Sequence, residues 1–269
     1  MQPNMQVAQL REIHSARCIG HHTRSSLRFR KGNHVANGAR TGHQHNQAIQ
    51  TESQTTVGRS AEFQRIQQET EFFALLLGAG WTAESALVDP FCGSGTIPIE
   101  AALMARRMPP GGHREFAFAR WPEFDAAAWA KLVDDARAGA RTGVPVPIVG
   151  SDRDAGAIEA SIANAQRAGV AHDVEWHQRP VSAMERVSES GLVAANPPYG
   201  KRIGGGGDVR NVYAQTGNVM RRLLGGWNVA FYIPDSRLAG QTGLTLKQEF
   251  RTVNGGIRVG AWIGAIPRR

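Results

Sequence analysis

Side chains that could do chemistry gather in two short segments of this 269-residue chain, about a hundred residues apart. The second segment reads Asn196-Pro197-Pro198-Tyr199. The two prolines fix the backbone and offer no N–H, so the Asn196 amide oxygen and the Pro197 carbonyl are left as hydrogen-bond acceptors. Such acceptors can draw an exocyclic nucleobase amine toward a tetrahedral, nucleophilic geometry, and a tyrosine ring can stack on an extruded base. The segment favours chemistry on a base amine, although Pro-Pro can also merely end a strand.

The first segment, Asp89 to Thr96, reads DPFCGSGT and leads from an apolar stretch into a helix-like one. Gly93 and Gly95 allow a sharp turn and the close approach of a ligand to the backbone. The start of the following helix offers free N–H groups for a carboxylate or phosphate. A dinucleotide fingerprint would need a small residue where this chain has Pro98, and a P-loop would need Gly-Lys-Ser/Thr. The segment therefore predicts a ligand-binding turn of neither kind.

A third polar group, Ser151-Asp152-Arg153-Asp154, follows the second predicted strand. Asp152 stands where an acidic residue can accept hydrogen bonds from a ribose diol. Asp154 is interpreted instead as the N-cap of the alanine-rich helix that follows.

Alternating strands and helices must position these segments. The predicted strands are 86–91, 146–152, 173–178, 191–196 and 227–234, and the predicted helices are 61–77, 96–107, 155–168 and 209–224. Residues 250–266 read as a strand pair turning at Asn254-Gly255-Gly256. This alternation predicts an α/β fold, a parallel sheet with helices on both faces and an antiparallel hairpin at one edge.

One part of the predicted domain, residues 108–145, interrupts this alternation. It carries five large aromatic residues, Phe116, Phe118, Trp121, Phe124 and Trp129. They could pack over the sheet edge or form a substrate platform. Packing is the favoured interpretation, because large aromatics are normally buried.

Composition limits the partners. Lys and Arg outnumber Asp and Glu by 31 to 23, a net charge of +8, which favours a polyanionic partner, nucleic acid first. Two cysteines cannot build a secreted disulfide framework, so a reducing, cytoplasmic setting is expected. No stretch has the ~20 apolar residues of a membrane helix, and no signal-peptide core is present.

The first 60 residues differ in composition from residues 61–269, the predicted catalytic domain. They hold eight Lys/Arg against two Glu, with sparse apolar residues, and are predicted to be a disordered basic tail. His14, Cys18, His21 and His22 match no zinc pattern, so no metal is expected.

DPFCGSGT and NPPYG together resemble the class I S-adenosylmethionine-dependent amino-methyltransferases, and more narrowly the bacterial THUMP-associated RNA guanine-N2 methyltransferases. The likeness runs from about residue 69 to 267 and includes GTIPIEAALMARR, FAFARWPEFD and VYAQTGNVM. The resemblance implies a Rossmann-like, doubly wound, mainly parallel seven-stranded sheet with a C-terminal antiparallel hairpin. It also implies methyl transfer from S-adenosyl-L-methionine to an exocyclic amine of RNA, guanine N2 of rRNA or tRNA.

The same resemblance implies roles for particular residues. It assigns cofactor binding to Asp89, Phe91, Cys92, Gly93, Ser94, Gly95, Thr96, Asp152 and Arg153, with the ribose at Asp152. It assigns the target base to Asn196, Pro197, Pro198 and Tyr199. Cys92 is interpreted as a turn residue rather than a nucleophile, so a covalent cysteine mechanism is not expected.

Two departures from the family pattern matter. Family members often have an acid after the third strand that reads the cofactor adenine, whereas residues 178–182 read QRPVS; backbone groups near Val181 or Ser182 would do this work. A THUMP region is not found in residues 1–60, so we expect either a truncated version of a longer protein or use of the basic tail. Two alternatives remain open, an N6-adenine methyltransferase on DNA or RNA and a catalytically impaired remnant that binds cofactor or RNA.

Overall fold

The computed structural model describes residues 71–109, 116–199, 208–254 and 256–268. The chain divides into two compact units, one of residues 56–107 and 141–269 and a smaller one of residues 1–55 and 108–140. The predictions for the tail, residues 1–60, and for a helix over residues 61–70 lie outside the described residues.

The larger unit is built on a seven-stranded sheet with the order β3-β2-β1-β4-β5-β7-β6. The strands are β1 (Ala86–Asp89), β2 (Ile148–Asp152), β3 (Glu175–Gln178), β4 (Gly191–Ala195), β5 (Asn228–Ile233), β6 (Leu246–Asn254) and β7 (Ile257–Ala265). The first five are parallel, and β7 runs antiparallel to both β5 and β6. The predicted mainly parallel sheet with an antiparallel hairpin at one edge is confirmed.

The central strands are short apolar runs. Every residue of β1 and β4 is buried, and so are the last five of the six residues of β5. Continuous burial is typical of parallel strands covered on both faces. Strand β6, at the edge of the sheet, alternates between exposed and half-buried positions along most of its length, as an edge strand covered on one face does.

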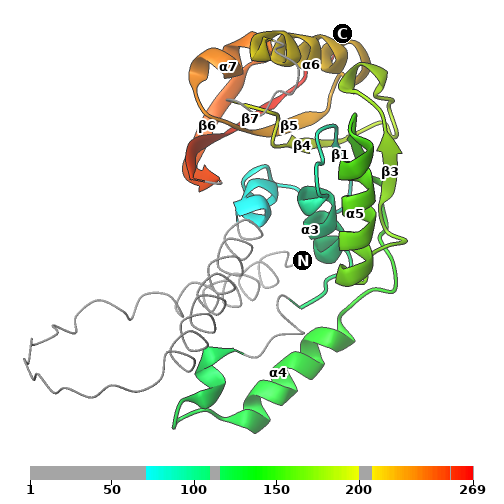
Figure 1. Ribbon diagram of the computed structural model, residues 1–269. Coiled ribbons are helices and arrows are strands. Elements are labelled where there is room, and N and C mark those ends of the chain that lie inside the picture. The colour runs from blue at the N-terminus through cyan, green and yellow to red at the C-terminus, as the bar shows by residue number, and fades with distance from the viewer. Residues whose placement is uncertain (1–70, 110–115, 200–207, 255, 269) are drawn as a thin grey trace, which may run out of the picture. The chain divides into compact units, whose positions relative to one another are not determined.

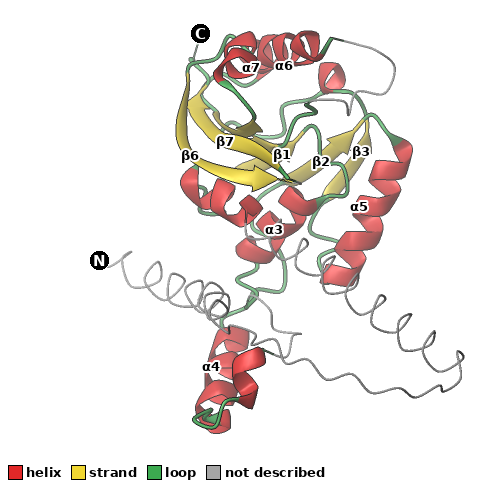
Figure 2. Ribbon diagram, turned by 60° about the vertical axis from the view of Figure 1, so that its left-hand side comes forward, coloured by secondary structure: helices red, strands yellow, loops and turns green. Residues whose placement is uncertain are grey.

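Helices cover both faces of this sheet. They are α3 (Thr96–Ala105), α5 (Ala155–Ala168), α6 (Val209–Leu223) and α7 (Ser236–Gln241), with a 3-10 turn η2 (Val181–Ala183). Figures 1 and 2 show α3 and α5 on one face and α6 and α7 on the other. Residues 71–78 are also helical. Among the described residues, no helix combines the length and the apolar character that crossing a membrane requires.

Helix α6 and the residues just beyond its end contribute several of the largest side chains of the core. Tyr213 and Met220, two turns apart on one face of α6, are buried to 1% exposure or less, as are Leu224 and Trp227 just beyond its end. They form one cluster with apolar residues of β1, β4 and β5. This spacing is that of an amphipathic helix packed on a sheet, and it fixes α6 beside the carboxyl end of β4.

The strand order reverses between β1 and β4, which are neighbours in the sheet although β2 and β3 come between them in the chain. In open α/β sheets the crossovers leave on opposite sides of such a point, and a crevice opens at the carboxyl ends of the strands. The segments after β1 and β4 therefore face the same crevice.

Several predicted boundaries were wrong by a few residues, for local reasons. Strand β1 stops at Asp89 rather than residue 91, because Pro90 has no N–H to donate. Strands β2 and β3 each begin two residues later than predicted. Strand β6 begins at Leu246, four residues earlier than predicted, and a register shift between Gln248 and Phe250 interrupts its pairing.

Helix α7 was not predicted. It has six residues, too few for an apolar period to show. Its cap was nevertheless present in the sequence: the Asp235 side chain accepts hydrogen bonds from the N–H groups of Arg237 and Leu238, both at 2.9 Å.

In the described residues of the smaller unit, a 3-10 turn η1 (Ala117–Arg120) precedes α4 (Ala126–Ala138), a helix that was also not predicted. Its five aromatic rings pack against one another, with centroids 5.0–6.4 Å apart. The rings thus contact one another, whereas packing of these aromatics over the sheet edge stays a prediction. None of the described residues of η1 and α4 is buried, and Trp121 is 56% exposed.

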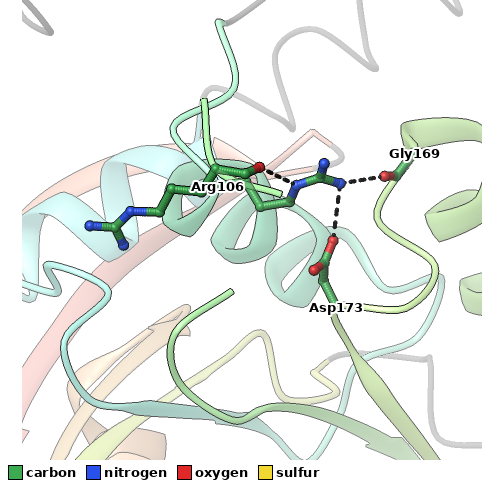
Figure 3. A network of polar contacts seen from close by, with 4 residues as sticks. Arg106, Gly169 and Asp173 are labelled. Atoms are coloured by element: carbon green, nitrogen blue, oxygen red, sulfur yellow. Dashed lines mark hydrogen bonds and ion pairs between the residues drawn. The ribbon is translucent and has the colours of Figure 1, made fainter. Parts of the chain in front are cut away.

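Arg106 holds together the two points where the chain leaves and re-enters the larger unit. Its Nε donates to the carbonyl of Arg141 (3.1 Å), and its Nη1 donates to the Gly169 carbonyl (2.8 Å) and to Asp173 (3.2 Å), as Figure 3 shows. The Arg141 N–H returns a bond of 2.7 Å to the Arg106 carbonyl. Residues 107–140 thus leave and return at one narrow neck.

Candidate active site

A cavity of about 620 Å³ lies at the carboxyl edge of the sheet. Its walls come from the turn after β1, the tip of β2, the start of η2, the segment after β4 and one side of α6. The lining residues are Phe72, Pro90, Phe91, Gly93, Ser94, Thr96, Asp152, Arg153, Asp154, Ala157, Pro180, Val181, Asn196, Pro197, Pro198, Tyr199, Val212, Gln215 and Asn254. The crevice that the strand order predicts is therefore present.

Most of the predicted site residues meet in this cavity. Its wall contains Phe91, Gly93, Ser94, Thr96, Asp152, Arg153, Asn196, Pro197, Pro198 and Tyr199. Three predicted cofactor residues, Asp89, Cys92 and Gly95, are not among the lining residues. They support the turn from behind, and direct contact of these three with a cofactor stays a prediction.

The turn after β1 holds its two glycines in the left-handed region, with φ of +52° at Gly93 and +85° at Gly95. A Cβ on Gly95 would lie 2.7 Å from the Trp176 ring and 2.8 Å from the Cβ of Ser161, so both backbone and space require glycine there. At Gly93 a Cβ would meet nothing within 4 Å. The backbone at Gly93 is therefore open to a ligand.

Helix α3 starts at this turn without a side-chain cap. Its N-cap residue is Gly95, which has no side chain to accept from the first amides of the helix. The first turn also contains no acidic residue. Uncapped amides lack intrahelical partners, and the helix dipole adds positive potential to them. Because Thr96 lies in the cavity wall, this end of α3 suits a bound carboxylate.

Asp152 ties the tip of β2 to the turn after β1. Its Oδ2 accepts from the Gly93 N–H (3.1 Å), and its Oδ1 accepts from the Asp154 N–H (3.0 Å). Each carboxylate oxygen keeps a second lone pair, so Asp152 can accept further donors from the cavity side. Asp154 caps α5 by accepting from the Ala157 N–H (2.8 Å), which confirms the predicted N-cap.

Asp89 and Cys92 are buried below the turn. Asp89 is 1% exposed, and its Oδ1 accepts from the Phe91 N–H at 3.0 Å. Burial raises the pKa of Asp89 well above its usual range; the Phe91 N–H opposes this rise and the Asp152 charge adds to it. Burial, with the Asp89 and Asp152 charges, also raises the pKa of the Cys92 thiol. A thiol held protonated is a poor nucleophile, which agrees with the interpretation of Cys92 as a turn residue.

The segment after β4 presents an acceptor to the cavity. Strand β4 ends at Ala195, and Asn196 to Tyr199 continue along the wall. The Asn196 Oδ1 is shielded from solvent, and no hydrogen-bond donor reaches it from the residues that the structure describes. Tyr199 is 2% exposed, so its ring is part of the packed wall. A buried carbonyl oxygen without a donor is suited to bind an N–H of a ligand.

Pro180 and Val181 form the wall next to Asp152. Val181, one of the two positions expected to offer backbone groups, lines the cavity, whereas Ser182 does not. Arg179 is turned to other partners: its N–H bonds to the Asp152 carbonyl (2.8 Å) and its guanidinium pairs with Glu185 (2.8 Å).

Sequence reasoning missed several lining residues, among them Phe72, Val212, Gln215 and Asn254. Val212 and Gln215 lie one turn apart on the cavity side of α6, a spacing that could have identified them once Tyr199 was placed. Phe72 and Asn254 lie far from both motifs in the sequence, and no local signal marks them as cavity residues.

Comparison with known proteins matches most of the described chain. The profile of the UPF0020 family, described as an RMKL-like methyltransferase domain, matches residues 69–259. The ribosomal RNA large subunit methyltransferase K/L of Shewanella baltica OS155 is 37% identical over 188 residues, 68% of this chain and 26% of that protein. The chain spans between a quarter and a half of the length of the curated relatives it matches first.

Two solved structures share the fold. SMU.472, provisionally named a methyltransferase and crystallised with SAH, superposes with a TM-score of 0.68 at 28% identity, covering 76% of this chain and 53% of its own. A protein from Listeria monocytogenes 4b F2365, named as a predicted N6-adenine-specific DNA methylase, gives 0.62 at 33% identity, covering 72% and 50%. With the family profile matched along most of the larger unit, the chain belongs to the UPF0020 family of RMKL-like methyltransferase domains.

Proposed function

We propose that this chain transfers the methyl group of S-adenosyl-L-methionine to the exocyclic N2 amine of a guanine in ribosomal or transfer RNA. One observation carries the proposal. The buried Oδ1 of Asn196, which has no donor among the described residues, and the open turn at Gly93 lie in the wall of one cavity. An amine acceptor and a cofactor turn in one cavity are what amine methylation needs.

The residues present fit the cofactor. The uncapped start of α3 provides amides for the carboxylate of its methionine part. Asp152 retains lone pairs for the ribose hydroxyls, and Pro180 and Val181 offer an apolar wall beside it for the adenine. The relative SMU.472, crystallised with SAH, supports the same cofactor here.

When bound, S-adenosyl-L-methionine supplies an electrophilic methyl group on a sulfonium. In the proposed reaction Asn196 Oδ1 and the Pro197 carbonyl accept the two N–H groups of the target amine and draw its lone pair out of the ring. Tyr199 gives the base an aromatic face to stack on. The wall holds the amine in line with the methyl group, so positioning provides much of the rate enhancement. Formation of the N–C bond would be balanced by cleavage of the methyl–sulfur bond, with S-adenosyl-L-homocysteine as the leaving group, and by loss of one amine proton to solvent.

RNA as the substrate is supported by the net charge of +8 and by the curated relative that acts on large-subunit rRNA. With such a substrate, we propose that the reaction takes place in the cytoplasm.

The test is methyl transfer from labelled S-adenosyl-L-methionine to transcripts of large-subunit rRNA and of tRNA, followed by nucleoside digestion. We expect N2-methylguanosine from the wild-type chain and none from Asn196→Ala, with cofactor affinity nearly unchanged. Calorimetric binding of the cofactor without transfer to any RNA would instead favour the impaired remnant.

A second candidate is methylation of adenine N6. The segment after β4 would accept either amine, and the Listeria relative is named as a predicted N6-adenine-specific DNA methylase. The same digest separates the two, because N6-methyladenosine in RNA, or N6-methyldeoxyadenosine when DNA is supplied, would replace N2-methylguanosine.

A further inference from the structure

The β6–β7 hairpin extends past the end of β5. Ile233, the last residue of β5, pairs with Gly260 of β7. The hairpin continues beyond this point with Val259, Arg258 and Ile257 paired to residues 252–254. Since β5 is parallel to β4, this overhang lies at the carboxyl edge, where Asn196 follows β4. Strand pairing thus carries the hairpin turn to the cavity; β6 and β7 are seen together in Figure 2.

Asn254, the last residue of β6, is the hairpin residue in the cavity wall. It is 2% exposed, and its Nδ2 is shielded from solvent with no acceptor in the described part of the chain. A buried amide nitrogen without an acceptor is costly. A ligand that brings an acceptor to this wall removes that cost.

The two asparagines of the cavity have complementary free groups. Asn196 offers an acceptor and Asn254 a donor, each without a partner among the described residues. A ligand that satisfies both presents a donor to Asn196 and an acceptor to Asn254. The Watson–Crick edge of a nucleobase does so.

Guanine and adenine differ in how this edge is arranged. In guanine, N1 lies between C2, which carries the amine, and C6, which carries the carbonyl oxygen. A protein donor on the far side of N1 from the amine therefore meets that oxygen. In adenine held by its C6 amine, the carbon on the other side of N1 carries only hydrogen. A protein donor on the far side of N1 from the bound amine therefore favours guanine over adenine.

We propose that Asn254 is a specificity-determining residue, whose Nδ2 donates a hydrogen bond to O6 of the target guanine while Asn196 accepts from N2. This rests on the proposed function and adds the residue that selects the base. Asn χ2 is a soft torsion, so the amide can turn toward O6 when the base enters.

Two variants test this assignment. Asn254→Ala removes the donor, and we expect kcat/KM on an rRNA transcript to fall about 10- to 100-fold. Asn254→Asp keeps the shape but sets a carboxylate against O6, so its loss should be larger. The signature of a donor is a loss of kcat/KM in Asn254→Ala with cofactor affinity and melting temperature unchanged, because a purely structural role would lower activity and melting temperature together.

The matched control is Thr252→Val, on the same inward face two residues earlier and outside the cavity wall. It should leave kcat/KM within about twofold. Calorimetry with S-adenosyl-L-methionine and thermal melts on all variants check the cofactor side and the fold. We expect wild-type affinity and melting in Asn254→Ala, and a lower melting temperature in Asn254→Asp because its carboxylate is buried.

The nucleoside digest completes the test. The wild-type product should be N2-methylguanosine, and Asn254→Ala should raise the share of N6-methyladenosine. Unchanged RNA kinetics in both Asn254 variants, or cofactor affinity lost in parallel with activity, would overturn the assignment of Asn254. Wild-type production of N6-methyladenosine alone would instead refute the proposed function, whatever the variants do.

Discussion

Replacing Asp152 with alanine tests how the cofactor side of the cavity is assembled. Its two oxygens each accept one backbone N–H, from Gly93 at 3.1 Å and from Asp154 at 3.0 Å. Alanine removes both bonds and any bond from a ribose. The variant should therefore change two measurable quantities, the affinity for S-adenosyl-L-methionine and the free energy of unfolding.

The sizes of both effects follow from the hydrogen bonds that Asp152 accepts. Hydrogen bonds to a charged group contribute about 1.5–3 kcal/mol. Loss of this contribution from the ribose weakens cofactor binding about 10- to 150-fold. The Asp152 residue is only half-buried, so water can replace part of what the two N–H groups lose. We expect the free energy of unfolding to fall by about 1–2 kcal/mol, or about 2–8 °C in Tm.

Calorimetry with the cofactor and thermal melts measure the two effects. The matched control is Asp154→Ala, which removes the same charge from the same wall but takes away the cap of α5 instead. It should cost about 1 kcal/mol of stability with a much smaller change in affinity. Unchanged affinity in Asp152→Ala, or an equal loss in both variants, would refute the ribose role of Asp152.

Three further predictions concern other parts of the site. Asn196→Ala should lower kcat about 10²–10³-fold, whereas Tyr199→Leu, which keeps bulk but loses the aromatic face, should mainly raise KM for RNA; steady-state kinetics that fail to separate them would contradict the assigned roles. Gly95→Ala should cost about 2–5 kcal/mol, from its positive φ and its overlap with the Trp176 ring, measurable by urea unfolding. Because the folded-state pKa of Asp89 is raised, the fold binds its proton more tightly than the unfolded chain does, and stability should decline as pH rises from about 4 through the raised pKa. Asp89→Asn should reduce that decline in melts between pH 4 and 8, and identical profiles would contradict it.

The turn after β1 and the segment after β4 were predictable because their signals are local. Glycines at positions 93 and 95 mark a turn that only they can adopt, and two prolines after Asn196 mark the end of a buried strand. Parallel pairing then brings the two segments to one edge without further information. The same logic identified Asp154 as a cap, since a cap bonds within three residues of itself.

Asn254 could not have been predicted in the same way. In the sequence it belongs to Asn254-Gly255-Gly256, where an asparagine is an ordinary turn residue. Its place in the cavity depends on β7 pairing antiparallel with β5 and overrunning its end. That register is set by long-range packing, and no residue near Asn254 encodes it.

Helix α4 was missed although, unlike Asn254, it has clear local signals in the sequence. Its sequence is rich in alanine and carries a capping Asp125 and a Lys131–Asp135 pair one turn apart. These signals stabilise a helix locally. The prediction relied on an apolar face, and none of the residues of α4 is buried.

The neck closed by Arg106 makes residues 107–140 an exchangeable module. Because the backbone groups of Arg106 and Arg141 bond at 2.7 Å, a link of a few glycines would rejoin the chain without stretching the sheet unit, and closing so short a loop costs little entropy. Segments of other lengths and chemistries could be grafted at this neck while the cavity is kept. A chain shortened in this way would also be a compact version of the cavity-bearing unit for cofactor-binding work.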